Sequence, residues 1–175
     1  ERKQDDLIPF SINEFKNSID IDEVQGEKSY STQERRSIRP CLDVNGIWGG
    51  YTDQGSKTVI PSKAYAKISM RLVSNQNSKE ISELFIDHMK KITPPGMKIK
   101  INEHHGGEPY ITSTNSQAFL AASKAYESVF EKKPFAVKDG GSIPIIAQFE
   151  KILGVKTILM GFGLDSDAIH SPNEH

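Results

Sequence analysis

Cysteine is nearly missing from this sequence, since Cys41 is the single one among 175 residues. An internal disulfide is therefore excluded, and so is a zinc site built from several thiolates. Long apolar runs are missing as well. The most apolar stretches, such as 143–147 and 158–160, are far shorter than the roughly 20 residues that a membrane-spanning helix needs. We therefore expect no spanning helix and no membrane partner.

An excess of charge of one sign is also absent. The chain has 22 Lys and Arg residues against 23 Asp and Glu residues, with a formal net charge of −1. This balance gives no electrostatic attraction to nucleic acid or anionic lipid, so we expect no nucleic-acid partner. A lone cysteine is compatible with a reducing compartment, and no charged-then-apolar leader follows Glu1. We predict a cytoplasmic location, with a signal peptide upstream of Glu1 as the alternative.

The first forty residues are polar and predict only short helices and loops. Ser11 followed by Glu14 is typical of a capping box, which predicts a short helix through Phe15. Two strands are expected after them, at 41–48 and 64–73. The second strand alternates with a period of two, which places one apolar face toward a core. That face holds Ala64, Ala66, Ile68, Met70 and Leu72.

A helix and a third strand are predicted next. Asn77 with Glu80 indicates the helix start, and the Pro-Pro-Gly sequence at 94–96 ends it. The apolar stripe of this helix is Ile81, Leu84, Phe85, Met89 and Ile92. Alternation over 97–101 predicts the strand. The order strand, strand, helix, strand predicts an α+β fold, an antiparallel sheet with helices on one face.

The pattern changes after the loop 103–110, which is the natural domain boundary. Thr114 is expected to cap a helix that runs to about Val129, and a second helix is expected over 143–153. Short apolar runs at 135–137 and 155–160 predict strands, the latter buried. Because two or three strands cannot cover both faces of their own sheet, this half is predicted to be a partial α/β segment of a larger domain.

The chemistry-bearing residues lie near the ends of these elements. His170 follows a predicted buried strand, where open α/β sheets place their sites, and its imidazole could bind a metal. A loop histidine without a metal is the more common alternative. Asp139 and Ser142 flank a Gly-Gly pair whose amides could face an anion, although Ser142 could instead only cap a helix.

Three further candidates are weaker. Arg71, on the polar face of a strand, could grip a carboxylate or be solvated. At most one of His104 and His105 can face a cleft, because neighbours on an extended chain point apart. Asp53, Lys57 and Thr58 lie in a loop that could be an ordinary turn. Only His170 is well placed as a ligand, so any metal centre must draw on residues outside this chain.

Four segments of the chain, in order, resemble the aminoacylase and carnosinase family of two-metal peptidases, above all its cytosolic nonspecific dipeptidases. They are Gly55-Ser56-Lys57-Thr58-Val59-Ile60-Pro61 leading into Ile68-Ser69-Met70-Arg71-Leu72-Val73, then His105-Gly106-Gly107-Glu108-Pro109, then Asp139-Gly140-Gly141-Ser142-Ile143-Pro144, and finally Ile169-His170-Ser171-Pro172-Asn173-Glu174. The resemblance implies that 1–106 is most of a lid, or dimerisation, domain. It implies that 107–175 is the truncated C-terminal part of the catalytic domain.

The resemblance also implies roles for these residues. His170 matches a metal-ligating histidine, Arg71 the arginine that holds the substrate carboxylate, and His105 a histidine that lines the pocket. Asp139 and Ser142 match a segment that contacts substrate, and Thr58 a residue that reaches the active site of the partner subunit. The implied cofactors are two divalent ions, zinc or alternatively manganese, and the implied partners are a dipeptide with a free carboxylate and a second copy of the chain.

The family's His-x-Asp motif, bridging Asp and Glu-Glu pair have no counterpart in this sequence. We therefore expect a fragment of a dipeptidase or amidohydrolase that holds no catalytic residue, binds no metal tightly and is inactive alone. In the intact enzyme, a water activated by two metals would hydrolyse the amide bond of a short peptide. The alternatives are a deacylase of N-acyl amino acids with the same fold, and a dimerising module without activity.

Overall fold

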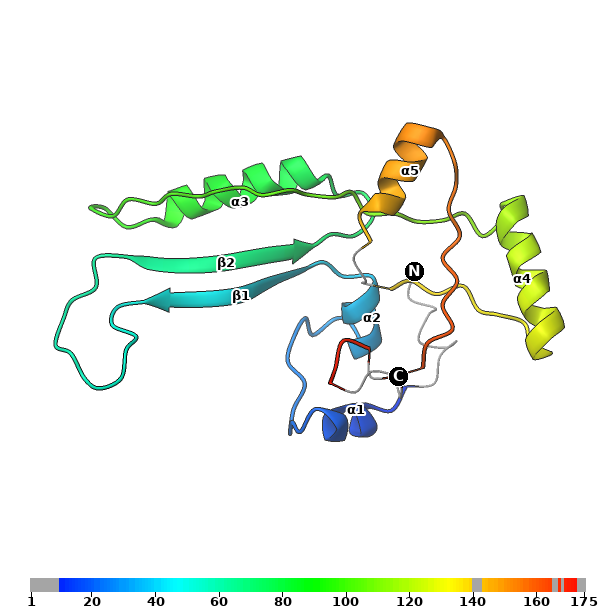
Figure 1. The fold of residues 1–175 in the computed structure, drawn as a ribbon, viewed down its shortest axis with the longest axis horizontal. Coiled ribbons are helices and arrows are strands. Elements are labelled where there is room, and N and C mark those ends of the chain that lie inside the picture. The colour runs from blue at the N-terminus through cyan, green and yellow to red at the C-terminus, as the bar shows by residue number, and fades with distance from the viewer. Residues whose placement is uncertain (1–9, 140–142, 165–166, 168, 173–175) are drawn as a thin grey trace. The chain divides into compact units, whose positions relative to one another are not determined.

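The computed structural model describes residues 10–139, 143–164, 167 and 169–172 of the chain. They belong to two compact units, each described by itself below (Figure 1). The first unit is Glu1–Ile111 with Phe135–Ala147, and the second is Thr112–Pro134 with Gln148–His175. The elements in order are α1 (Ile12–Ser18), α2 (Thr32–Ser37), β1 (Cys41–Gly49), β2 (Ala64–Arg71), α3 (Ser78–Ile92), α4 (Gln117–Phe130) and α5 (Ile145–Leu153).

An antiparallel pair, β1 and β2, forms the sheet of the first unit. Val44 lies opposite Ile68, but Gly46 lies opposite Lys67, so Asn45 is an extra residue that forms a β-bulge. This bulge explains why the apolar residues of β1 are spaced 42, 44 and 47: Ile47 returns to the face of Val44. Both predicted strands are confirmed.

The helix after the sheet, α3, begins and ends where the sequence predicts. The Asn77 side chain accepts a hydrogen bond from the amide of Glu80 at 3.1 Å, and the helix ends just before Pro94. It runs back along β2 (Figure 1). The α+β class is therefore confirmed, with a two-stranded antiparallel sheet and helices.

The predicted apolar stripe of α3 is only partly right. Ile81, Phe85 and Met89 are half-buried, as expected. Leu84 and Ile92, in contrast, are 60% and 54% exposed. Ile81, Phe85 and Met89, which are spaced by four, thus face inward. Leu84 and Ile92 lie on a part of the helix surface that this unit leaves exposed.

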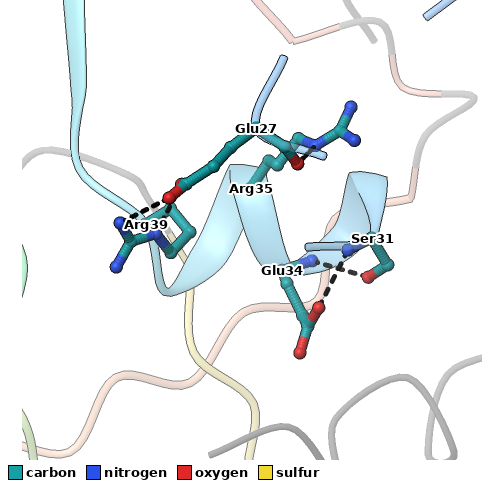
Figure 2. Close-up of polar contacts among 5 residues, drawn as sticks. All are labelled: Glu27, Ser31, Glu34, Arg35 and Arg39. Atoms are coloured by element: carbon teal, nitrogen blue, oxygen red, sulfur yellow. Dashed lines mark hydrogen bonds and ion pairs between the residues drawn. The ribbon is translucent and has the colours of Figure 1, made fainter. Parts of the chain in front are cut away.

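The polar N-terminal stretch forms two short helices, as predicted. The Ser11 hydroxyl caps α1 by accepting from the amide of Glu14 at 3.3 Å. At α2 the capping is reciprocal, since the Glu34 amide donates to the Ser31 hydroxyl and the Ser31 amide donates to the Glu34 carboxylate (Figure 2). Glu34 is 6% exposed, so this capping box lies in one of the few buried places of the described chain.

The second unit is built around α4 and the end of α5, and two predicted helix starts need correction. Ser116 rather than Thr114 caps α4, because the Ser116 hydroxyl accepts from the amide of Phe119 at 3.2 Å. The final helix begins at Ile145, not at Ile143, and ends before Gly154, whose φ is +67°.

Three predicted strands are wrong. In the structure, 97–101, 135–137 and 155–160 are irregular segments without a ladder partner. A strand exists only when its amides and carbonyls pair with a neighbour, and the described residues offer none to these segments. Leu159 in the expected buried strand is 58% exposed. In the described part of the chain, no helix is long and apolar enough to cross a membrane.

Candidate functional site

Arg71 is the last residue of β2 and lies on the polar face of the hairpin. Cys41 is its partner across the sheet, and Asp43 and Ser69 form the next pair on the same face. The Cys41 thiol donates a hydrogen bond to the Asp43 carboxylate at 3.4 Å. Partial burial raises the pKa of the Cys41 thiol, and the hydrogen bond to Asp43 raises it further. Arg71 is exposed.

A tight turn carries the chain from Arg71 into α3. The Val73 amide donates to the Gln76 side-chain carbonyl at 2.9 Å, and the Gln76 amide donates to the Val73 carbonyl at 3.2 Å. Asn75 adopts a left-handed φ of 66°, which Asn tolerates better than most residues. Arg71 is thus joined to the helix start at Ser78 by a short segment with its own hydrogen bonds.

Glu108 binds that same helix start from a segment 30 residues further along. Its carboxylate accepts from the Ser78 hydroxyl at 2.6 Å and from the Ser78 amide at 3.2 and 3.3 Å. The Asn77 side-chain amide donates to it at 3.5 Å. We call this set of contacts, between Glu108 and the pair Asn77 and Ser78, the Glu108 clasp. A carboxylate is favoured here by the free amides and the positive end of the helix dipole.

Two glycines let the His105 segment pass through this narrow place. A Cβ atom on Gly106 would lie 3.0 Å from the Ser78 Cβ, and one on Gly107 would lie 2.8 Å from the Pro144 Cβ. The segment is therefore packed between the start of α3 and Pro144, the second residue after the Gly-Gly-Ser sequence. His105 itself is exposed.

The structure thus brings together three of the four segments that the sequence singled out. They are the chain after Arg71, the His105–Glu108 segment and the end of the Asp139–Pro144 segment. Asp139 is exposed, whereas Ser142 lies outside the described residues. All of these belong to the first unit.

Thr58 lies apart from Arg71 within that unit. It belongs to the long loop between the strands, whereas Arg71 is at the far end of β2, seven residue steps or about 23 Å along the strand. Figure 1 shows the loop running on beyond the end of the sheet opposite to the start of α3. Thr58 and Arg71 of one chain are therefore poorly placed to touch the same small substrate.

His170 belongs to the second unit, in a loop that α4 holds. The Tyr126 hydroxyl donates to the Gly161 carbonyl at 3.1 Å, and its ring stacks on Phe162 with centroids 5.3 Å apart. Further along, the Leu164 amide donates to the Asp167 carboxylate at 2.7 Å. His170 is exposed and has a φ of 66°. Among the described residues before it, Gly161, Leu164 and Asp167 therefore have hydrogen-bond partners.

The described residues form no cluster of metal ligands around His170, the predicted ligand. Within 10–139, 143–164, 167 and 169–172, no three His, Cys, Asp or Glu side chains lie close enough to hold a metal. An exposed imidazole can supply one nitrogen ligand. Zinc sites need three or four protein ligands, so His170 fits a metal only together with residues from elsewhere.

Sequence reasoning missed Glu108 and Tyr126. Glu108 lies in the boundary loop and in one of the four matching segments, but its partners are 30 and 31 residues away and no local pattern reveals them. Tyr126 lies on the predicted helix that follows Thr114. An aromatic residue on α4 and the Gly-Phe-Gly sequence at 161–163 could have indicated a stacking contact, but many such pairs never meet.

Comparison with known proteins extends these observations. Residues 11–97 match the model of the M20 peptidase dimerisation domain. The Cys-Gly metallodipeptidase DUG1 of Candida albicans is 34% identical over 173 residues, which are 97% of this chain and 36% of that protein. The Beta-Ala-His dipeptidase of Homo sapiens is 28% identical over 170 residues, 95% of this chain and 34% of that protein. The chain thus spans about a third of the length of these relatives.

Solved structures give the same answer for the fold. The dipeptidase Dug1p from Saccharomyces cerevisiae aligns with a TM-score of 0.75 and 30% identity, over 95% of this chain and 36% of that one. The M20 family metallo-carboxypeptidase Sso-CP2 from Sulfolobus solfataricus aligns with a TM-score of 0.75 and 28% identity, over 89% and 40%. This chain therefore carries an M20 peptidase dimerisation domain, and its homologues include metallodipeptidases.

Proposed function

We propose that this chain is the lid and C-terminal part of a metal-dependent dipeptidase that hydrolyses the amide bond of a short peptide with a free carboxylate. The observation that carries the proposal is the packing of the His105–Glu108 segment against both the helix start that follows Arg71 and Pro144 at the end of the Asp139 segment. These segments lie more than 30 residues apart in the sequence. Their convergence is expected if they line one substrate pocket. Similarity to dipeptidases over nearly the whole chain supports the same function.

In the proposed mechanism, Arg71 holds the substrate. Its guanidinium can form two parallel hydrogen bonds to a terminal carboxylate, which fix both the position and the direction of the peptide. His105 lines the pocket beside it, and Asp139 and Ser142 contact the substrate from the Gly-Gly-Ser segment. The residues of this chain thus orient the scissile bond, and no catalytic residue is assigned to it.

Thr58 is proposed to act on the substrate of a partner subunit. Its loop lies about 23 Å along β2 from Arg71, which supports a role at a different copy of the site. The match of residues 11–97 to a peptidase dimerisation domain supports a homodimer. Light scattering tests this part of the proposal, and an intact enzyme that stays monomeric would contradict it.

The proposed cofactors are two divalent ions, zinc or alternatively manganese, and when bound they activate the water that attacks the amide. His170 would provide one imidazole nitrogen. Hydrogen bonds from Tyr126 to Gly161 and from Leu164 to Asp167 hold the chain upstream of that imidazole, which supports a defined position for it. The other ligands would come from polypeptide outside this chain. A cytoplasmic location remains a further part of the proposal, which cell fractionation tests.

Replacing Arg71 tests the proposed function. In the intact enzyme, Arg71→Ala should remove a charge-assisted contact worth about 2–3 kcal/mol, which lowers kcat/KM on a dipeptide roughly 30- to 150-fold. Hydrolysis of the C-terminal amide of the same dipeptide should change far less, because that substrate has no carboxylate to lose.

A matched control is Arg36→Ala, which removes an exposed arginine of α2 and should leave both rates unchanged. An Arg71→Ala enzyme with unaltered kcat/KM on the dipeptide would contradict the role of Arg71. An intact wild-type enzyme that cleaves no dipeptide with zinc or manganese would contradict the proposed function itself. Cleavage of N-acyl amino acids instead would favour the deacylase alternative.

A further inference from the structure

We propose that Glu108 is a positioning residue: through the Glu108 clasp it holds His105 and Arg71 in a fixed relation, and so sets the preference for substrates with a free carboxylate. This inference rests on the proposed function. Glu108 is not itself expected to touch the substrate, because its carboxylate already accepts hydrogen bonds from Asn77 and Ser78.

The first step is the strength of the clasp. The bond from the Ser78 hydroxyl is 2.6 Å long, which is typical of a hydroxyl that donates to a charged carboxylate. The Ser78 amide is at the N-terminus of α3, where its carbonyl partner would lie outside the helix. A negative charge there also meets the positive end of a 15-residue helix. Several hydrogen bonds thus converge on the Glu108 carboxylate.

The second step leads from the clasp to His105. Only two residues separate His105 from Glu108, and both are glycines. Two flexible glycines would normally let the neighbouring His105 side chain sample many positions. Here Gly106 lies against Ser78, and Gly107 lies against Pro144. With Glu108 fixed as the third point, the His105 backbone is held despite the glycines, and without Glu108 they become a hinge.

The third step leads from the clasp to Arg71. Asn77 accepts from the Glu80 amide with its side-chain carbonyl and donates to Glu108 with its side-chain amide. It therefore joins the clasp to the helix cap. The turn at 73–76 then connects this cap to the end of β2 through two further hydrogen bonds. Arg71 and His105 are in this way fixed to the same few backbone atoms.

The consequence is a specific loss when Glu108 is removed. A misplacement of about 1 Å between groups that hold a substrate costs up to about 100-fold, so a partial loosening should cost on the order of tenfold. The loss should fall on KM, because Arg71 and His105 bind and orient the peptide. It should also be larger for a dipeptide than for its amide, because only the dipeptide uses the Arg71 contact fully.

The test compares variants of the intact enzyme on a dipeptide and on its C-terminal amide. Glu108→Ala should raise KM for the dipeptide roughly tenfold, with a smaller change in kcat and a smaller change for the amide. Glu108→Gln keeps one oxygen acceptor for Ser78 and should restore part of the loss. The double variant Glu108→Ala with Ser78→Ala should be no worse than Glu108→Ala alone, because both remove the same contact.

The matched control is Glu103→Ala, an exposed acidic residue of the same loop, which should leave KM unchanged. Two outcomes would overturn the inference: a Glu108→Ala enzyme with wild-type KM, or one whose losses are equal for the dipeptide and the amide, as a purely structural defect would produce. In both cases the activity of the wild-type enzyme on dipeptides still decides the proposed function, and the Arg71→Ala result still decides the role of Arg71. A wild-type enzyme without dipeptidase activity overturns the proposed function and this inference together.

Discussion

The α2 region and the β1–β2 hairpin, both in the first unit, differ in how completely they satisfy their own side chains. Around α2, Arg39 donates to the Glu27 carboxylate at 2.7 and 2.9 Å and lies over the Tyr30 ring at 4.4 Å, while Arg35 donates to the Glu27 carbonyl at 2.9 Å (Figure 2). In the hairpin, Ile47 is 79% exposed and Ile60 93%. One region is closed by contacts within 15 residues, and the other leaves apolar surface uncovered.

This difference shows which parts of the chain need contacts with additional polypeptide to satisfy or cover their side chains. A local polar network needs only its own segment, because capping boxes and turns join residues three to twelve positions apart. An apolar sheet face needs a second layer, and among the described residues only Ile146 is a buried apolar side chain. Apolar surface of this extent marks a contact with further protein.

The largest expected effect comes from charging the apolar face of the hairpin. Ile47→Asp should destabilise the intact enzyme by about 3 kcal/mol, because the face is then covered and an unpaired charge would be buried. Urea unfolding of the intact enzyme measures the loss. Ser69→Asn on the polar face is the control and should cost little, because it adds a polar group without placing a second negative charge opposite Asp43. An Ile47→Asp enzyme as stable as the wild type would show that nothing covers this face.

A smaller effect is expected from the α2 capping box. Ser31→Ala should cost about 1 kcal/mol of unfolding free energy, since it leaves the Glu34 amide without its side-chain acceptor. The exposed Ser29 offers a matched control, Ser29→Ala, which should be neutral. Because the region is closed locally, the cost should be similar in this chain alone and in the intact enzyme. A loss of unfolding free energy seen only in the intact enzyme would contradict the view that the α2 region is stabilised by local contacts.

The helix starts and the strand pair could be predicted from the sequence because their signals are local. Ser11 and Asn77 accept from the amides that their spacing indicates, and the alternation at 64–71 gives β2. The α4 start was misplaced because Thr-Ser-Thr-Asn-Ser at 112–116 offers several capping residues, and only the backbone geometry selects Ser116.

Long-range features could not be predicted in the same way. The segments 97–101, 135–137 and 155–160 have strand-like composition, but a strand also needs a neighbour, which composition does not supply. The candidate residues lie near element ends, as the sequence indicates, but no local pattern in the sequence reveals Glu108 as a contact between their segments. Their individual roles and the domain boundary at 106 and 107 remain predictions.

The smallest expected effect concerns the reactivity of Cys41 on the polar face of the hairpin. Its raised pKa means that less thiolate is present at a given pH, so alkylation by iodoacetamide should be slower near pH 8 than for an ordinary thiol. Asp43→Asn removes a charge that disfavours the thiolate, so the pKa should fall and alkylation should become faster. Ser69→Ala is the control. An Asp43→Asn protein that reacts more slowly would contradict this assignment.

The extra residue Asn45 gives the hairpin one more property. The bulge increases the local right-handed twist of β1, and the loop that carries Thr58 extends from the strand end beyond it. Deleting Asn45 would restore a regular ladder in which Ile47 stays on the face of Val44, but it would remove the extra twist and so turn the loop in a new direction. The single extra residue thus helps to determine the position of Thr58. One insertion or deletion in β1 can therefore change how far this loop extends toward another subunit, without any substitution in the loop itself.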